Sequence, residues 1–276
     1  MGTNARLSGL WAAARALFRV GEGAIPCVGL VVLGGCLTLI ISPDDSSTPL
    51  KPSEGGQPGF PTIVIDPGHG GNDDGTKWRG LAEKDLTLDV GMRLDRLLKL
   101  AGFPTVMTRT EDVYIPLSDR VNVANQFEDA VFVSVHFNSD RDAASSGVQT
   151  HFAKKKELPG PEWNWVGLFA KDRPDTPDTS EELAADVETN LVSRTEARNR
   201  GIHANDFYVV HHTRCPAVLV EGGFVSNSFE AQLLRNEEYR ERIAEGIAEG
   251  VMAYVKSRTP PTVPPPPPGP PVQALR

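Results

Sequence analysis

Residues 62–71 read TIVIDPGHGG, and this stretch decides the fold. Its first four residues are all β-branched, which is typical of a buried strand. Asp66, Pro67 and Gly68 then end the strand in a loop, because these residue types are common in turns. The stretch therefore predicts a strand whose carboxyl end leads directly to a histidine, His69.

Strands and helices alternate after residue 71. The apolar periodicity predicts helices over residues 84–100, 117–127, 181–192 and 238–255, and strands over residues 105–107, 130–135 and 217–220. Strands that are apolar throughout and separated by helices favour a mainly parallel sheet covered by helices on both faces. We therefore expect an α/β fold with a single domain over residues 60–258.

Four polar residues interrupt this apolar pattern near the predicted ends of elements. They are two histidines and two glutamates: His69, Glu83, His136 and Glu221. A single histidine is usually a hydrogen-bonded structural residue, and a glutamate at the start of a helix usually interacts with the helix dipole. However, the carboxyl ends of parallel strands meet at one edge of a sheet, where the two imidazoles and two carboxylates would converge. A catalytic zinc ion requires three protein ligands, an open position for water and a nearby base.

The motifs that carry these residues resemble those of one protein family. They are residues 63–71, Glu83-Lys84, Thr108-Arg109, Leu117, Arg120, residues 134–138 and residues 216–227. In this order, and over nearly all of residues 60–258, they resemble the motifs of the zinc-dependent N-acetylmuramoyl-L-alanine amidases of bacterial cell-wall remodelling. The resemblance implies a six-stranded sheet flanked by helices.

The resemblance also implies a role for each of the four residues. His69, Glu83 and His136 would be the ligands of Zn²⁺, and Glu221 would be the catalytic carboxylate. The implied reaction is hydrolysis of the amide between N-acetylmuramic acid and the L-alanine of the stem peptide in peptidoglycan, during cell-wall remodelling or daughter-cell separation. Glu221 would take a proton from the attacking water and return it to the departing amine.

Two alternative functions stay open from the sequence. A zinc peptidase that cuts within the stem peptide would use the same metal and base, so only its products would differ. A peptidoglycan-binding module without catalysis would lack a ligand or the base, whereas all four residues are present here. The net charge of −8 gives no reason to expect nucleic-acid binding, which requires clustered lysine and arginine.

Three further polar residues have two interpretations each. Asp66 would orient metal ligands or loops, or it would serve the turn after the first strand. Arg109 and Arg120 could contact carboxylates of the substrate. Internal salt bridges of these arginines with Asp112 or Asp119 are the favoured interpretation.

The N-terminal segment has the properties of a membrane anchor. Residues 24–42 carry no charge, and at ~1.5 Å per residue they would span about 28 Å as a transmembrane helix. Arginines dominate the charges of residues 1–23, which predicts that these residues are cytoplasmic and that the catalytic domain lies outside, in the periplasm or on the cell-wall side. Residues 33–36 (LGGC) alternatively resemble a lipobox, in which Cys36 would be lipidated. Both interpretations hold the protein at a membrane.

Linkers surround the predicted domain. Residues 43–59 are rich in serine, proline, glycine and aspartate and predict a spacer, and residues 259–276 form a proline-rich tail. Residues 153–180 form an insertion with lysines, prolines and tryptophans. We expect either a loop beside the active-site groove that grips the substrate or blocks access, and on which an activator protein acts, or a packed surface loop.

Overall fold

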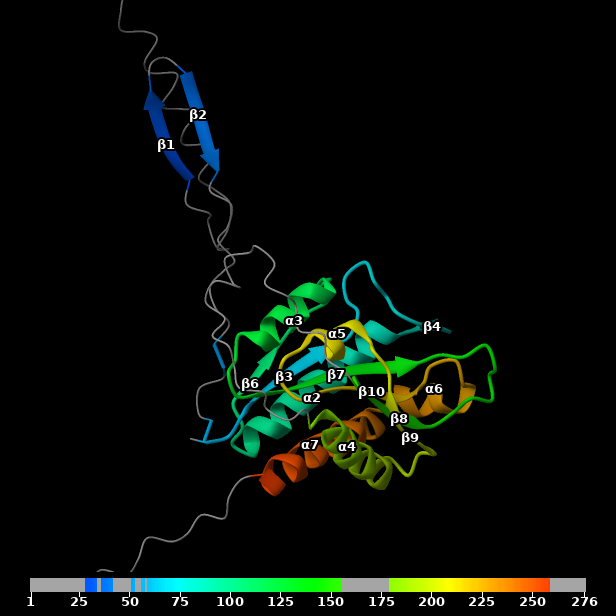
Figure 1. The fold of residues 1–276 in the computed structure, drawn as a ribbon. Helices are drawn as coiled ribbons and strands as arrows, with labels where there is room; N and C mark the ends of the chain where they lie inside the picture. The colour runs from blue at the N-terminus through cyan, green and yellow to red at the C-terminus, as the bar shows by residue number, and fades with distance from the viewer. Residues whose placement is uncertain are drawn as a thin grey trace, which may run out of the picture. The chain divides into compact units, whose positions relative to one another are not determined.

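A six-stranded β-sheet forms the centre of the larger of two units in the chain. The computed structural model describes residues 28–33, 36–41, 51–52, 56–57, 59–154 and 179–258. The contacts within the chain define one unit over residues 1–49 and a second over residues 50–276. In their order across the sheet, the strands are β6 (Thr105–Met107), β3 (Thr62–Pro67), β7 (Ala130–Asn138), β10 (Ala217–Phe224), β8 (Val148–Phe152) and β9 (Asn199–Ala204) (Figure 1).

The strand directions confirm a mainly parallel sheet. Strands β6, β3, β7 and β10 are parallel to one another, whereas β8 is antiparallel to β10 and β9 is parallel to β8. The four parallel strands include every strand that the apolar pattern predicts. Strands β8 and β9 carry many polar residues, so a search for continuous apolar runs does not find them.

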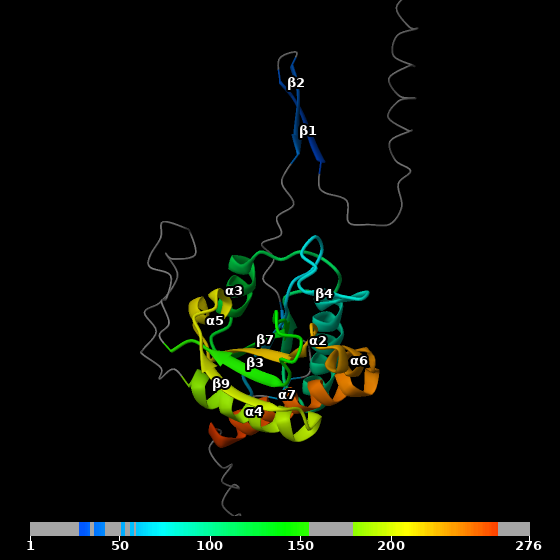
Figure 2. The same cartoon turned by 90° about the vertical axis from the view of Figure 1, so that its right-hand side faces the viewer.

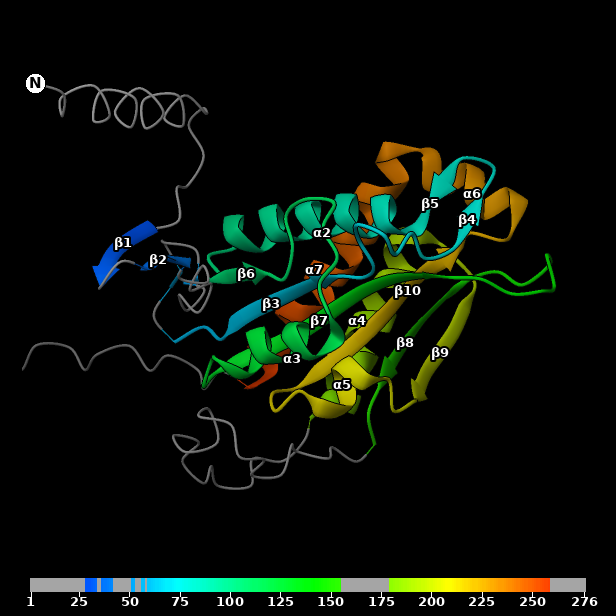
Figure 3. The ribbon, with the colours of Figure 1, turned by 90° about the horizontal axis from the view of Figure 1, so that it is seen from above.

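Helices cover both faces of this sheet, as the sequence predicts. One face is covered by α2 (Glu83–Leu100), α4 (Ser180–Thr195) and α7 (Glu237–Arg258), and the other by α3 (Leu117–Asn125) and α5 (Tyr208–His212) (Figures 2 and 3). Helix α6 (Ser228–Arg235) follows β10, and the short strands β4 (Lys77–Trp78) and β5 (Leu81–Ala82) form a hairpin ahead of α2.

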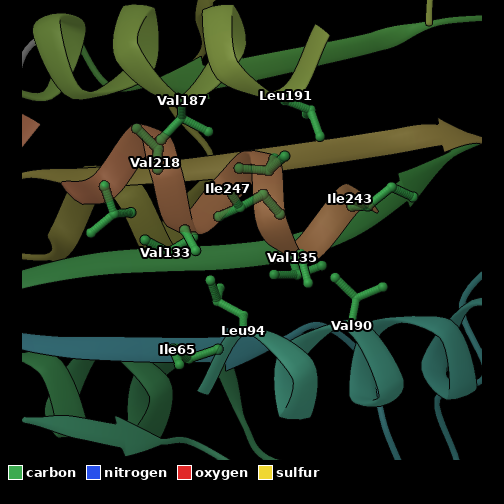
Figure 4. Packing of buried hydrophobic residues seen from close by; sticks show 14 of the residues in the cluster. Ile65, Val90, Leu94, Val133, Val135, Val187, Leu191, Val218, Ile243 and Ile247 are labelled. Atoms are coloured by element: carbon green, nitrogen blue, oxygen red, sulfur yellow. The ribbon is translucent and has the colours of Figure 1, made fainter. Parts of the chain in front are cut away.

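The larger core lies between the sheet and helices α2, α4 and α7. Alternate residues of the strands point into it and meet one stripe of each helix, as the close view shows for Ile65, Val133, Val135 and Val218 against Val90, Leu94, Val187, Leu191, Ile243 and Ile247 (Figure 4). All ten of these side chains are fully buried. Burial of such side chains contributes roughly 1.5–3 kcal/mol each, so this layer fixes the sheet on which the functional residues lie.

Helices α4 and α7 lie side by side and in close contact below the sheet (Figure 2). Two glycines of α7 make this approach possible. A Cβ atom added to Gly250 would lie 2.4 Å from the Cα of Val187, and one added to Gly246 would lie 2.6 Å from the Cα of Leu191. The two backbones are therefore closer than any larger residue would allow.

The N-terminal unit differs from the transmembrane helix that residues 24–42 predict. Strands β1 (Val28–Leu33) and β2 (Cys36–Ile41) form an antiparallel pair in which Leu33 is opposite Cys36. Both runs are rich in valine, leucine and isoleucine, of which valine and isoleucine in particular favour β-strands. Among the described residues, none of the helices has both the length and the apolar character needed to cross a bilayer. Membrane anchorage and lipidation of Cys36 stay predictions.

Four of the predicted segments lie outside the described residues, wholly or for the most part. These are residues 1–23, the linker over residues 43–59, residues 155–178 of the insertion and the proline-rich residues 259–276.

Candidate metal centre

The sheet brings the four predicted site residues to the carboxyl ends of its parallel strands. His136 is in β7 and Glu221 is directly opposite it in β10. His69 follows β3, and Glu83 is the first residue of α2. The ligand atoms of His69, Glu83 and His136 all lie within 4.8 Å of one another. The sequence therefore predicts correctly which histidines and which glutamate come together.

The loop after β3 bends sharply to place His69 beside His136. His69 itself has a φ angle of 58°, in the left-handed region that only a few non-glycine residues adopt. A Cβ atom at Gly68 would lie 2.3 Å from the imidazole of His136. Only glycine at position 68 thus allows the loop to approach this close to the second histidine.

Glu83 lies between the two histidines. Its Oε1 atom is 3.0 Å from Nε2 of His69 and 3.1 Å from Nδ1 of His136. The backbone N–H groups of Thr76 and Phe137 donate hydrogen bonds to this carboxylate, at 2.8 and 3.0 Å. Burial opposes the charged form, but the hydrogen bonds with the two histidines hold the pKa of Glu83 well below its usual range. The carboxylate is therefore buried, ionised and fixed in position.

Asp73 orients His69, and the sequence offers little signal for it. The Nδ1 atom of His69 lies 2.8 Å from Oδ2 of Asp73, whose Oδ1 accepts a hydrogen bond from the N–H of Gly75. This contact leaves Nε2 of His69 directed at Glu83. Burial lowers the pKa of His69, but the hydrogen bonds to Glu83 and Asp73 outweigh it and raise that pKa to about 8. A carboxylate that holds the far nitrogen of a histidine is the usual support of a metal ligand.

The residues present fit a zinc ion. Two imidazoles and one carboxylate are a donor set of known catalytic zinc sites. Here the three side chains converge on one small volume, and an outer carboxylate fixes one imidazole. A negative carboxylate with an imidazole nitrogen on either side is an arrangement that a divalent cation would satisfy.

Glu221 is a half-buried residue beside this cluster. Its Oε2 atom is buried and has no hydrogen-bond partner within the described residues. Burial raises the pKa of Glu221 to about 7, and the nearby charge of Glu83 adds to this effect while those of the histidines oppose it. A carboxyl group whose pKa is close to neutrality can both accept and release a proton, which is the property of a general base.

Arg120 and Asp66 form a buried ion pair next to the loop that carries His69. The predicted salt bridge of Arg120 with Asp112 or Asp119 is therefore wrong. The guanidinium lies 2.7 Å from Oδ1 of Asp66 and donates hydrogen bonds to the carbonyls of Pro67, His69 and Ile115. Asp66 also accepts hydrogen bonds from two neighbouring hydroxyl groups. The pair therefore supports the backbone of the loop that carries His69.

Arg109 has a similar role, and its predicted salt bridge is also wrong. Its guanidinium donates hydrogen bonds to the carbonyls of Pro67, Gly68, Lys84 and Glu111. Backbone carbonyls are poor targets for prediction because every residue carries one, so the sequence favours carboxylate partners that the fold does not use.

Strand β8 adds polar groups next to Glu221. Gln149 is directly opposite Glu221 in the sheet, and Oε1 of Gln149 accepts a hydrogen bond from Arg200. His151 contacts the side chains of Gln149 and Asn205 through its two ring nitrogens, at 3.1 and 2.9 Å. Sequence analysis does not find these residues, because β8 itself is not among the predicted strands.

Comparison with known proteins identifies the family. The sequence profile of the N-acetylmuramoyl-L-alanine amidase family matches residues 63–253, which contain the whole of the sheet except the first residue of β3. The chain belongs to this amidase family. The fold and the grouping of His69, Glu83 and His136 agree with that assignment.

Comparison with individual relatives supports the same family assignment. The chain is 30% identical to the N-acetylmuramoyl-L-alanine amidase LytC of Bacillus subtilis over 184 residues, which are 67% of this chain and 33% of LytC. The crystal structure of an N-acetylmuramoyl-L-alanine amidase from Clostridium difficile 630 superposes with a TM-score of 0.62 at 36% identity, over 72% of this chain and 99% of that one. The CwlD amidase of Clostridioides difficile, solved in complex with the GerS lipoprotein, gives a TM-score of 0.61 at 27% identity over 71% of this chain and 99% of that one.

A pocket of about 270 Å³ opens beside the candidate metal centre of this amidase. His69, Asp73 and His136 are among its lining residues. Aromatic and aliphatic side chains also line it, namely Tyr114 and Leu117 near the start of α3 and Phe207 and Tyr208 at the start of α5. We call this part, defined by Tyr114, Leu117, Phe207 and Tyr208, the aromatic pocket.

Proposed function

We propose that this amidase is a zinc enzyme, in which His69, Glu83 and His136 hold the metal and Glu221 is the general base. The amide that it hydrolyses joins N-acetylmuramic acid to the L-alanine of peptidoglycan stem peptides. One observation carries the proposal above all. The Oε1 atom of Glu83 lies 3.0 and 3.1 Å from nitrogens of the two histidines, next to Glu221, whose Oε2 atom is buried.

The protein residues divide the chemistry between them. When bound, zinc supplies a Lewis acid that activates water and polarises the amide carbonyl. Glu221 accepts a proton from the attacking water and gives it to the nitrogen of L-alanine as the amide bond breaks. Asp73 keeps His69 in the tautomer that leaves Nε2 free for the metal. The Arg120–Asp66 pair holds the backbone of the loop in the conformation that presents His69.

The cellular setting forms part of the same proposal. The uncharged residues 24–42 or a lipid on Cys36 would hold the protein at a membrane, with the catalytic domain on the periplasmic or cell-wall side. There it would act in cell-wall remodelling or daughter-cell separation. Because CwlD is solved with the GerS lipoprotein, we further propose that an activator protein acts on this chain at the insertion over residues 153–180.

The masses of the products test the reaction. Full-length protein loaded with zinc is incubated with purified peptidoglycan, and the soluble fragments are weighed by mass spectrometry. Stem peptides that begin with a free L-alanine amino group are the expected products. Fragments cut within the stem peptide would instead identify a zinc peptidase. Bound zinc without any product would favour a peptidoglycan-binding module, unless an activator protein restores cleavage.

A further inference from the structure

The aromatic pocket gathers exposed rings next to the metal centre. Tyr114, Phe207 and Tyr208 are 51%, 42% and 43% exposed, and they are three of the four exposed aromatic residues in the described part of the chain. The fourth, Phe229, lies in α6, away from the pocket lining. Exposed aromatic residues scattered singly need no explanation, but three that line one pocket indicate a binding surface.

Two of these rings are held in place before any ligand arrives. The ring of Tyr208 stacks on His212, with centroids 4.1 Å apart and planes inclined by 25°. The ring of Phe207 meets His151 edge-on at 5.1 Å. Rings that are already ordered lose little conformational entropy on binding, which favours recognition of a flat, partly apolar ligand. Helices α3 and α5 lie on the same face of the sheet at this place (Figure 3).

The charges of the pocket decide which part of peptidoglycan it suits. Arg120 is the cation among its described lining residues, and its guanidinium is buried and engaged by Asp66 and three backbone carbonyls. Asp73 also lines the pocket, and its carboxylate is engaged by His69. The four residues that define the aromatic pocket carry no charge, so the free carboxylates of stem peptides would find no positive partner among them.

The sugar chain has the matching chemistry. The carboxyl group of N-acetylmuramic acid is consumed in the scissile amide, so the glycan on this side of the bond is uncharged. Sugar rings present faces of C–H groups, which pack against the electron-rich faces of aromatic rings. The acetamido methyl groups add apolar surface that suits residues such as Leu117.

From these observations we propose that the aromatic pocket binds the N-acetylated sugar chain of peptidoglycan, so that the stem peptide leaves the metal centre in another direction. Tyr208 and Phe207, at the start of α5, and Tyr114 and Leu117, near the start of α3, form this sugar site. This inference rests on the proposed function, because it assigns one side of the same active site to one part of the substrate. It also predicts a preference that zinc chemistry alone does not give: substrates with more sugar units bind better.

The test compares two substrates in three proteins. A disaccharide-peptide and a lactoyl-peptide share the scissile amide, but only the first carries sugars. In the wild-type protein, kcat/KM is expected to be higher for the disaccharide-peptide. Tyr208→Ala should lower the ratio of the two kcat/KM values by about tenfold, which corresponds to roughly 1.4 kcal/mol. Phe229→Ala removes an equally accessible ring outside the pocket and should keep the wild-type ratio.

A binding measurement separates this inference from the proposed function. Titration of an uncharged N-acetylglucosamine tetramer into the full-length Glu221→Gln protein needs no turnover. A second substitution in this protein, either Tyr208→Ala or Tyr114→Ala, should weaken binding of the tetramer about tenfold, with the melting temperature unchanged. Unchanged tetramer binding in both pocket variants would overturn the proposal, and so would a loss of affinity for isolated stem peptide in place of the sugar. If no amide is cleaved by the wild type, the proposed function fails while the tetramer titration still tests the pocket.

Discussion

Glu221 and His136 lie directly opposite each other on the adjacent parallel strands β10 and β7. The hydrogen-bond ladder between these strands therefore fixes the distance between the proposed base and a proposed zinc ligand. Successive residues of a strand point to opposite faces, so a shift of one residue in this register would move Glu221 to the other face of the sheet. The geometry of the site is thus set by the most buried part of the fold.

Zinc binding should stabilise the protein. A ligand that binds only the folded state adds about 4 kcal/mol when its free concentration is 1,000 times its Kd. Dialysis against a chelator should lower the melting temperature and abolish hydrolysis, and added zinc should restore both. The measurement is thermal unfolding followed by circular dichroism. His136→Ala should remove the zinc-dependent shift, whereas His203→Ala, which changes an exposed histidine outside the metal cluster, should keep it.

Loss of Arg120 should be costly for stability. In Arg120→Met, the buried carboxylate of Asp66 loses its counter-charge, and the carbonyl of His69 loses a hydrogen bond. Removal of one partner of a buried ion pair costs about 3–5 kcal/mol. Arg96 also pairs with a glutamate, Glu241, but its side chain is half exposed, so Arg96→Met should cost less than about 1 kcal/mol. Urea unfolding of both variants measures the difference, and equal losses would contradict the structural role of Arg120.

The sequence alone predicts those site residues that interrupt a strongly apolar pattern. His136 and Glu221 are polar residues at the ends of apolar strands, and His69 follows such a strand, so these three positions stand out by contrast with their neighbours. Asp73 lies in a loop among glycines and other polar residues, where no period distinguishes it. Its function depends on a single contact with His69 that only the folded loop creates.

The fold likewise has parts that the apolar pattern predicts and parts that it does not. The parallel strands and long helices follow from apolar periodicity, but β8 is polar along much of its length, so Gln149 is not found next to Glu221. The pairing of Arg120 with Asp66 joins residues that are 54 positions apart, and nothing in their local sequence selects Asp66 over the nearer Asp119. Val28–Leu33 and Cys36–Ile41 form strands although the sequence predicts a membrane helix there, because many residues that suit a membrane helix also suit β-strands.

Acid should destabilise the fold through His151. Burial, and then the positive charges of His203 and His136, lower the pKa of His151 from 6.5 to about 4. The unfolded chain therefore binds a proton that the folded chain does not, so this stabilisation is fully present above pH 6.5 and is lost as the pH falls toward 4. The loss is on the order of 3 kcal/mol.

Comparison with a variant isolates this effect from other titrating groups. Urea unfolding is measured at pH 7 and pH 4.5 for the metal-free wild type and for His151→Gln, which keeps a side chain able to form hydrogen bonds. The free energy of unfolding should fall less in the variant. An equal fall in both proteins would show that His151 does not carry the acid sensitivity.

Gly250→Ala should destabilise the protein although alanine is the better helix former. In an exposed helix this substitution stabilises by about 1 kcal/mol. Here the new Cβ atom would lie 2.4 Å from the Cα of Val187 in α4, so the two helices must separate. The expected net loss is about 1–3 kcal/mol in urea unfolding. A gain in stability would mean that α4 and α7 are not in close contact at this point.

The most direct test of the zinc amidase mechanism measures bound zinc and hydrolysis on the same samples of wild-type and Glu221→Gln protein. Glutamine has nearly the same shape as glutamate but cannot accept the proton, and loss of a general base typically costs roughly 10²–10⁴ in rate. The account predicts one zinc ion per chain in both proteins and a rate lower by about this factor in the variant. Hydrolysis at the wild-type rate by Glu221→Gln, or full activity of the wild type without bound zinc, would contradict it.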